Sequence, residues 1–289
     1  MIDMTDTIER RFAIITDSTA DMPPDLAKRR GIEVVPLLVS FGADSFPDGT
    51  LTQQEFFERM AASPQLPTTS QPSVGAFVEV FERALARAGE VVSMHISSNL
   101  SGTVASARQA AERFGGRVHV FDSLTLSGGL ALQVLDAADA ADAGLSAEET
   151  LTRLQATRRR AKMIVGLDSL DNLARGGRIG KVSALLGSLL NLKVTLTLDE
   201  EGKFTPVKRT RGESAAIAHT LDWIEDAMGG TRSGTFAVGH AMSAERAVRI
   251  RDAIAARFDA IDIIMYEAGS VVSTHTGTAW GVAVLPVSA

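Results

Sequence analysis

Short apolar runs alternate with stretches of helical periodicity along the first half of the chain. The runs predict strands at residues 12–16, 33–41, 91–96 and 117–121. Helices are predicted between and after them at residues 21–31, 52–62, 73–88, 101–114 and 124–143. Strands that alternate with helices of this length are typical of βαβ units, so the sequence predicts the α/β class with a parallel sheet.

Two helix starts are marked by capping residues. Asp21, followed by two prolines, is predicted as the N-cap of the first helix, which Gly31 closes. Thr52 and Glu55 have the spacing of a capping box, which predicts a helix start there. Residues 63–72, rich in Pro, Ser and Thr, are predicted to form a loop.

The pattern changes from about residue 146. A helix and a strand at 163–167 precede a predicted β-hairpin of 192–198 and 204–208, and hairpins belong to antiparallel or mixed sheets. Further helices are expected at 213–228 and 244–258, and further strands at 235–240, 261–266 and 282–285, the last of which closes the sheet. We therefore predict an N-terminal α/β domain over 1–160 and a smaller α/β domain with a mixed sheet over 161–289.

The amino-acid composition excludes several classes of protein and of site. The 289 residues are 45% hydrophobic and 22% charged, which is typical of a globular chain and excludes disordered and coiled-coil classes. The net charge of −6 argues against nucleic acid as a partner. No cysteine is present, which excludes disulfides, thiolate metal sites and a cysteine nucleophile, and fits a cytoplasmic location.

No targeting or membrane-spanning segment is expected. The first twelve residues carry Asp3, Asp6 and Glu9 and lack the apolar stretch of a signal peptide. The apolar run at 184–198 is interrupted by Asn191 and Lys193 and is too short to span a bilayer.

Known catalytic motifs are missing. Residues 176–180 with Lys181 resemble a phosphate-binding loop, but Arg175 and Val182 occupy positions where a Walker loop needs Gly and Ser or Thr. Arg175, Arg178 and Lys181 offer positive charge to an acidic partner instead, or form a solvated turn. The five histidines lack metal-ligand spacing, so no metal site is expected, and no Gly-x-Ser-x-Gly elbow occurs.

Hydroxyl-rich stretches are the more informative feature. They are Thr16–Thr19, which follows the first strand, and residues 67–73, 95–103 and 273–277, which are predicted as loops. Hydroxyls and amides at a helix N-terminus, as predicted near Ser101, bind anions. Helix caps and turns explain any single stretch equally well.

Taken in order, these stretches resemble the DegV family, and in particular the fatty-acid-binding subunit of bacterial fatty acid kinase. The matching pieces are Ile15-Thr-Asp-Ser-Thr19, Thr69-Ser-Gln-Pro-Ser73, Ile96-Ser-Ser-Asn-Leu-Ser-Gly-Thr103, Asp122-Ser123, Leu173-Ala-Arg-Gly-Gly-Arg-Ile-Gly-Lys181 and His275-Thr-Gly277. They cover nearly the whole chain.

The resemblance implies a two-domain DegV-like fold that holds a long-chain fatty acid such as palmitate in a tunnel between the domains. It assigns carboxylate binding to Thr69 and Ser101, places His275 near the head group and places Arg211 at the pocket mouth. Where relatives commonly have small residues this chain has Trp280, which bears on the pocket's shape.

In the kinase system a separate ATP-binding subunit phosphorylates the bound carboxylate, so this chain would present the substrate without a cofactor or catalysis of its own. The resemblance also allows transient membrane contact. The alternative from the residues alone is a self-sufficient phosphotransferase or hydrolase that uses Asp17 and Ser18. A regulatory or scaffold role is the third option.

Overall fold

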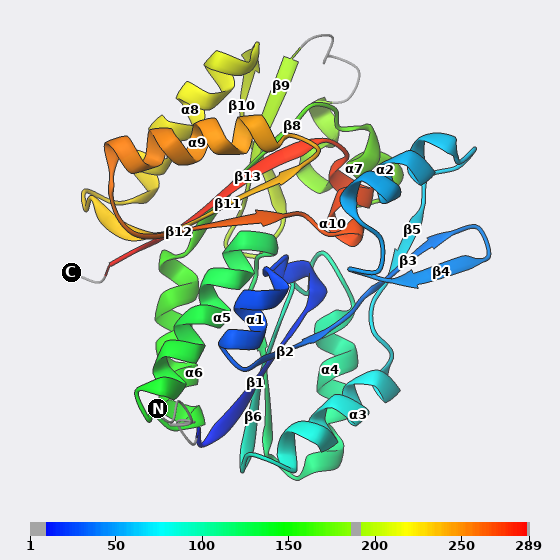
Figure 1. The fold of residues 1–289 in the computed structure, drawn as a ribbon, viewed down its shortest axis with the longest axis vertical. Coiled ribbons are helices and arrows are strands. Elements are labelled where there is room, and N and C mark those ends of the chain that lie inside the picture. Colours follow the sequence, from blue (N-terminus) through cyan, green and yellow to red (C-terminus); the bar gives the residue numbers. More distant parts are fainter. Residues whose placement is uncertain (1–9, 186–191, 288–289) are drawn as a thin grey trace, which may run out of the picture.

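The computed structural model describes residues 10–185 and 192–287, which form three sheets (Figure 1). The first sheet is parallel and consists, in spatial order, of β2 (Ile32–Val35), β1 (Phe12–Asp17), β6 (Glu90–His95) and β7 (Val118–Asp122). A small antiparallel sheet consists of β4 (Asp44–Pro47), β3 (Leu38–Phe41) and β5 (Thr68–Ser70). The first sheet supplies the parallel unit that the alternating pattern predicts.

The largest sheet is mixed. Its strands are, in spatial order, β10 (Phe204–Arg211), β9 (Leu192–Leu198), β8 (Lys162–Leu167), β13 (Ala279–Pro286), β11 (Ser233–Ala241) and β12 (Asp259–Glu267). Only the β11–β12 pair is parallel, and β9 and β10 form the expected hairpin. The predicted α/β class, with one parallel and one mixed sheet, is confirmed. The division into domains 1–160 and 161–289 stays a prediction.

Helices cover both main sheets. Those before β8 are α1 (Pro24–Arg29), α2 (Gln53–Ala62), α3 (Val74–Leu85), α4 (Thr103–Ala111), α5 (Ser127–Asp142) and α6 (Ala147–Arg160). Those after it are α7 (Asp171–Arg175), α8 (Glu213–Ala227), α9 (Ala244–Arg257) and α10 (Ser270–Thr276), with 3₁₀ turns at η1 (Ser18–Ala20), η2 (Glu112–Phe114) and η3 (Gly180–Leu185). The Thr52–Glu55 capping box is present at the start of α2.

Helix α5 lies between the two main sheets. Fourteen of its 16 residues are buried, because it contacts β1 and β6 on one side and β11 and β13 on the other. Most of its leucines and alanines belong to one apolar cluster that continues into both sheets. Apolar residues on both of these sides of the helix are the expected result of such a position.

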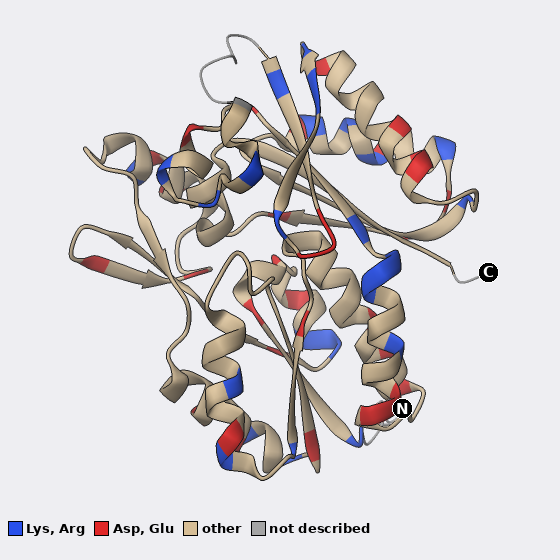
Figure 2. Cartoon of the chain, turned by 180° about the vertical axis from the view of Figure 1, so that it is seen from behind, with Lys and Arg blue, Asp and Glu red and all other residues tan. Residues whose placement is uncertain are grey.

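The outer faces of the sheets are covered separately. Helices α8 and α9 pack on the mixed sheet, and α3 and α4 pack on the parallel sheet (Figure 1). Acidic and basic residues are interspersed along these helices (Figure 2), and Arg257 of α9 pairs with Asp222 and Glu225 of α8. In the described part of the chain, no helix combines the length and the apolar character needed to cross a membrane.

Several predicted elements differ from the structure. The strand predicted at 33–41 is two strands in different sheets, because Pro36 lacks the amide needed to continue the ladder. Asp21 is not an N-cap: it has a φ of 49°, and α1 begins only at Pro24. The strand near 282–285 does not close the sheet. As β13 it lies between β8 and β11, which fits a strand buried on both faces.

The predicted loops also contain regular structure. Residues 68–70 form β5, and the hydroxyl-rich stretch at 273–277 belongs mostly to α10. Thr274 and Thr276 donate hydrogen bonds to the carbonyls of Ser270 and Val272, so these hydroxyls are satisfied within the helix. Part of the apolar run 184–198, residues 186–191, lies outside the described residues.

Candidate functional site

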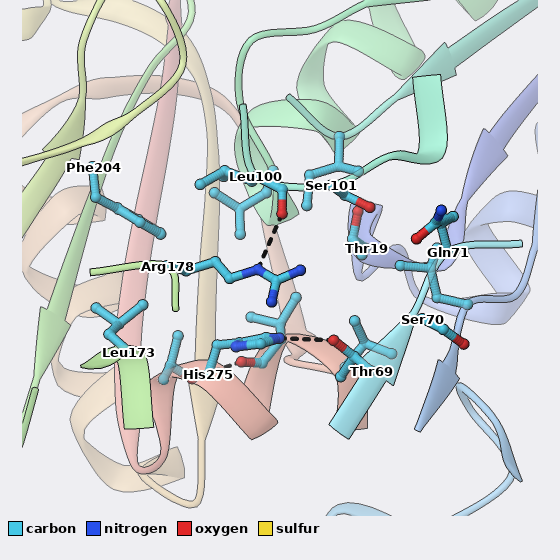
Figure 3. Close-up of a pocket in the computed structure, with 16 residues that line it drawn as sticks. Thr19, Thr69, Ser70, Gln71, Leu100, Ser101, Leu173, Arg178, Phe204 and His275 are labelled. Atoms are coloured by element: carbon cyan, nitrogen blue, oxygen red, sulfur yellow. Dashed lines mark hydrogen bonds between the residues drawn. The ribbon is translucent and has the colours of Figure 1, made fainter. Parts of the chain in front are cut away.

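A polar cavity lies where the small sheet, the start of α4 and helix α10 meet (Figure 3). It encloses about 560 Å³ of space free of protein atoms, part of it open to solvent. Its polar lining comprises Thr19, Thr69, Ser70, Gln71, Ser101, Arg178, His275 and Thr276. These residues come from both sides of residue 160, so distant parts of the sequence build one site.

Thr69 and His275 are joined across this cavity. Thr69 is held on β5 by pairing with Val39, and its Oγ1 lies 2.8 Å from Nε2 of His275 on α10. Burial, aided by the positive charge of Arg178, lowers the pKa of His275 to about 4. The imidazole is therefore neutral at pH 7.

The environment of Nδ1 indicates which tautomer His275 adopts. Nδ1 is buried without a hydrogen-bond partner and packs on Gly176, where an added Cβ would lie only 2.3 Å away. A buried N–H without a partner costs more than an unprotonated nitrogen. The proton therefore belongs on Nε2, which donates to Thr69 Oγ1. The Thr69 hydroxyl is left free to donate into the cavity.

Ser101 sits just before the N-terminus of α4. Its Oγ lies 2.8 Å from Oγ1 of Thr103 and accepts a hydrogen bond from the Thr103 amide. The N-cap is Gly102, and Gln71 packs so closely on it that an added Cβ would lie 2.9 Å from Gln71 Nε2. This end of α4 therefore adds the positive end of a helix dipole to the hydroxyl donors.

Arg178 supplies the positive charge of the site. Its Nη1 donates to the carbonyl of Gly176 at 2.8 Å, and its Nε donates to the carbonyl of Leu100 at 3.3 Å. These bonds hold the guanidinium between His275 and Ser101, as Figure 3 shows. A cation in this position attracts an anionic head group.

The structure thus brings together three of the four predicted site residues, Thr69, Ser101 and His275, but not Arg211. Arg211 is exposed at the end of β10 and does not line the cavity. Phe204, at the other end of the strand, does line it, and the two residues are seven positions apart along the strand, or about 23 Å. The arginine at the cavity is Arg178, which the sequence marked only as a positive charge.

An apolar cavity adjoins the polar one. It comprises about 370 Å³ of space free of protein atoms, part of it open to solvent, and shares Leu126, Phe204, Val272 and Thr276 with its neighbour. Its remaining lining is mostly small or aliphatic and includes Met163, Val165, Gly239, Ala241, Ala268, Ala279 and Gly281. The space exists because β11 and β13 carry Gly and Ala on the face that looks toward α5.

Trp280 points the other way. Its ring lies against Gly166 in the apolar cluster under α8 and α9, and Arg246 stacks on it at 4.5 Å. The neighbouring Ala279 and Gly281 face α5. Trp280 is among the residues that line the apolar cavity, while its indole packs in the core on the outer side of the mixed sheet.

Asp17 and Ser18, the residues of the enzymatic alternative, are engaged in structural bonds. Asp17 is fully buried and accepts from the Thr19 amide and hydroxyl, from His95 Nδ1 and from the Ile96 amide. Ser18 Oγ accepts from the Leu37 amide. Within residues 10–185 and 192–287, no group of three or more His, Asp or Glu side chains is placed to hold a metal ion.

The fold and the site define an α/β protein with an amphipathic cavity between two sheets. The family described as "Uncharacterised protein, DegV family" matches residues 11–287. A DegV domain-containing protein of Deinococcus radiodurans is 40% identical over 283 residues, which cover 96% of this chain and 99% of that protein. This chain belongs to the DegV family.

Solved structures of relatives share the whole fold. One is a DegV family protein from Thermus thermophilus whose description is of fatty acid binding. It superposes with a TM-score of 0.92 at 36% identity and covers 96% of this chain and 100% of its own. DegV from Bacillus subtilis, described as a fatty acid binding protein, superposes with a TM-score of 0.86 at 28% identity and covers 96% of this chain and 100% of its own.

Proposed function

We propose that this protein binds one long-chain fatty acid such as palmitate, with the carboxylate in the polar cavity and the acyl chain in the apolar cavity. The observation that carries this proposal is that the two cavities adjoin and share four lining residues. The donors Thr69, Ser101 and Arg178 converge at one end, and Gly and Ala of β11 and β13 leave apolar space at the other. An amphiphile with one anionic end matches this arrangement.

The energetics favour such a ligand. Each buried methylene contributes up to about 0.8 kcal/mol, so a chain of sixteen carbons is held even after the cost of association. The carboxylate loses water and must regain donors. Two hydroxyls, a guanidinium and the amides at the start of α4 supply them, while neutral His275 orients Thr69.

The family relatives support the same ligand class. The proteins from Thermus thermophilus and Bacillus subtilis are described as fatty acid binding, and both match this chain over nearly its full length. The proposal extends that property to this chain through the residues of its own cavity.

We propose further that the protein presents the bound carboxylate to an ATP-binding kinase subunit. The resemblance to a kinase subunit motivates this step, and the partial opening of the polar cavity to solvent is compatible with it. The chain has no Walker loop of its own. The enzymatic alternative gains less support, because all the bonds of Asp17 are structural.

Extraction of the purified protein followed by mass spectrometry is the direct test of binding. We expect a fatty acid in about equimolar amount, and competition by palmitate for a fluorescent fatty acid probe. An empty protein that also fails to bind the probe would overturn the proposal. For presentation, the chain alone with ATP and palmitate should give no acyl phosphate, whereas addition of an ATP-binding kinase subunit should give product.

A further inference from the structure

Tyr266 separates the apolar cavity from a third hollow, which we call the acidic cleft. The acidic cleft is lined by Asp17, Asp21 and Asp48 together with residues of η1, α2 and the start of α10. Tyr266, on β12, lines the apolar cavity on one side and the acidic cleft on the other. Its ring is buried, with 6% of the residue exposed.

A glycine on the neighbouring strand lets the ring lie across the sheet. Gly239 of β11 pairs with Tyr266, and an added Cβ there would lie 2.1 Å from the ring carbon Cζ. Because Gly239 has no side chain, the Tyr266 ring packs on its backbone and extends toward α5. A larger residue at this position would displace the ring.

Hydrogen bonds fix the far end of the ring. The Tyr266 hydroxyl accepts from the Gly128 amide at 3.1 Å and lies 3.1 Å from Ser127 Oγ. Ser127 gives its only proton to Asp21, which in turn accepts from the Gly269 amide. The Tyr266 hydroxyl thus has hydrogen-bond partners in both Ser127 and Gly128, and the ring face toward the apolar cavity presents no unsatisfied polar group.

The two ends of this pair of adjoining cavities differ in chemistry. Arg178 stands at the polar end, and the carboxyl groups of Asp21 and Asp48 stand beyond Tyr266. Burial raises the pKa of both carboxyls, and in neither protonation state do they offer the positive charge that Arg178 offers to an anion. A fatty acid therefore enters with its carboxylate toward Arg178 and its methyl end toward Tyr266.

We infer that Tyr266 is the end wall of the acyl cavity and sets the longest acyl chain that the protein holds well. This inference rests on the proposed fatty acid binding and names its specificity-determining residue. A chain that reaches the ring gains nothing from further methylenes. Without the ring, additional carbons extend into the space of the acidic cleft.

The test measures affinity for saturated fatty acids of twelve to twenty-two carbons by competition with a fluorescent fatty acid. In the unmodified protein, affinity should rise by about fourfold for each added methylene until a cut-off length. Tyr266→Ala should move that cut-off to longer chains and raise the affinity ratio of the twenty-carbon to the sixteen-carbon acid by about tenfold or more. Tyr266→Phe keeps the ring and should keep the cut-off.

A second variant, Gly281→Ala, tests the same inference if Tyr266→Ala does not fold. At Gly281 an added Cβ would lie 3.4 Å from Met163 Cε and 3.6 Å from the Tyr266 hydroxyl, which is ordinary contact. Gly281→Ala is therefore accommodated and fills part of the cavity before the ring, so its cut-off should move to shorter chains. Phe258→Ala, on the outer side of the mixed sheet, is the control for loss of a buried ring and should not move the cut-off.

The outcomes separate this inference from the proposed function. If the unmodified protein binds no fatty acid, the proposed function fails. If it binds and the cut-off is the same in Tyr266→Ala, Gly281→Ala and Phe258→Ala, only the end-wall role is overturned. Opposite shifts in Tyr266→Ala and Gly281→Ala support it, and the Gly281→Ala result decides alone if Tyr266→Ala does not fold.

Discussion

Two histidines make nearly the same contact in very different places. His95 Nε2 lies 2.7 Å from Ser93 Oγ, and His275 Nε2 lies 2.8 Å from Thr69 Oγ1. His95 is fully buried in the parallel sheet, with Asp17 on its other nitrogen. His275 lines a cavity, its other nitrogen has no partner, and the nearby charge is the cation Arg178.

Contact geometry alone therefore does not define a reactive site. Ser93, His95 and Asp17 have the order of contacts seen in a hydrolytic triad, yet none of the three side chains is exposed. Ser93 and His95 line none of the three cavities described above. Asp17 borders the acidic cleft but is fully buried and bonded to Thr19, His95 and Ile96, so this set ties the end of β1 to the end of β6. The Thr69–His275 pair has fewer contacts but faces open space, so it is the pair that can bind.

The largest effect expected from this comparison is on stability. In Asp17→Ala, buried donors on Thr19, His95 and Ile96 lose their acceptor, and each such loss costs about 1–3 kcal/mol. The free energy of unfolding in urea should fall by about 3 kcal/mol or more. Asp44→Ala, at an exposed position on β4, is the matched control, and equal effects would refute the structural role of Asp17.

The second effect is on binding. Thr69→Ala and Ser101→Ala each remove a hydroxyl donor from the polar cavity, so palmitate affinity should fall by about 1–3 kcal/mol with little change in stability. Thr68→Ala is the control, because its exposed side chain alternates to the other face of β5. Unchanged affinity in both cavity variants would argue against the assigned carboxylate site.

The third effect is on pH dependence. His275 has a pKa of about 4 when folded and about 6.5 when unfolded, so the unfolded chain binds more protons between these values. Folding stability should therefore fall as the pH drops from 6.5 to 4, and less so in His275→Gln. NMR of the imidazole protons checks the titration directly, and a midpoint near 6.5 in the ligand-free protein would contradict it.

The smallest expected effect is on the pKa of His275, and it distinguishes burial from the charge of Arg178 as causes of the lowered pKa. Arg178→Gln removes the positive charge but leaves burial, which is the larger cause. The pKa of His275 should rise above about 4 and stay below 6.5. Arg175→Gln, which changes an exposed charge that does not line the cavity, is the matched control. The same titration in both variants would show that Arg178 does not act on His275.

The sequence predicted the elements whose signals are local. Alternating apolar runs located β1, β6 and β7, and the Thr52–Glu55 spacing located the start of α2. The family motifs pointed to Thr69, Ser101 and His275, which the structure brings to one cavity.

What the sequence did not predict depends on distant contacts. Arg178 is placed by a bond to Leu100, 78 residues earlier, so nothing in its neighbourhood assigned it to the cavity. The hydroxyls of α10 were assigned to a loop because they also bond to their own helix, which composition alone does not reveal. Gly239 and Gly281 contribute to the apolar cavity because they have no side chains to fill it. Hydrophobic periodicity does not indicate where such a cavity lies.

The position of α5 has a consequence for how the protein unfolds. A helix buried against both sheets leaves no boundary at which one sheet can melt while the other keeps its core. We therefore expect a single cooperative transition rather than two. The adjoining cavities lie near the start of α5, so a ligand bound there raises the melting temperature of that one transition by mass action. The melting temperature therefore reports how much of the protein has ligand bound.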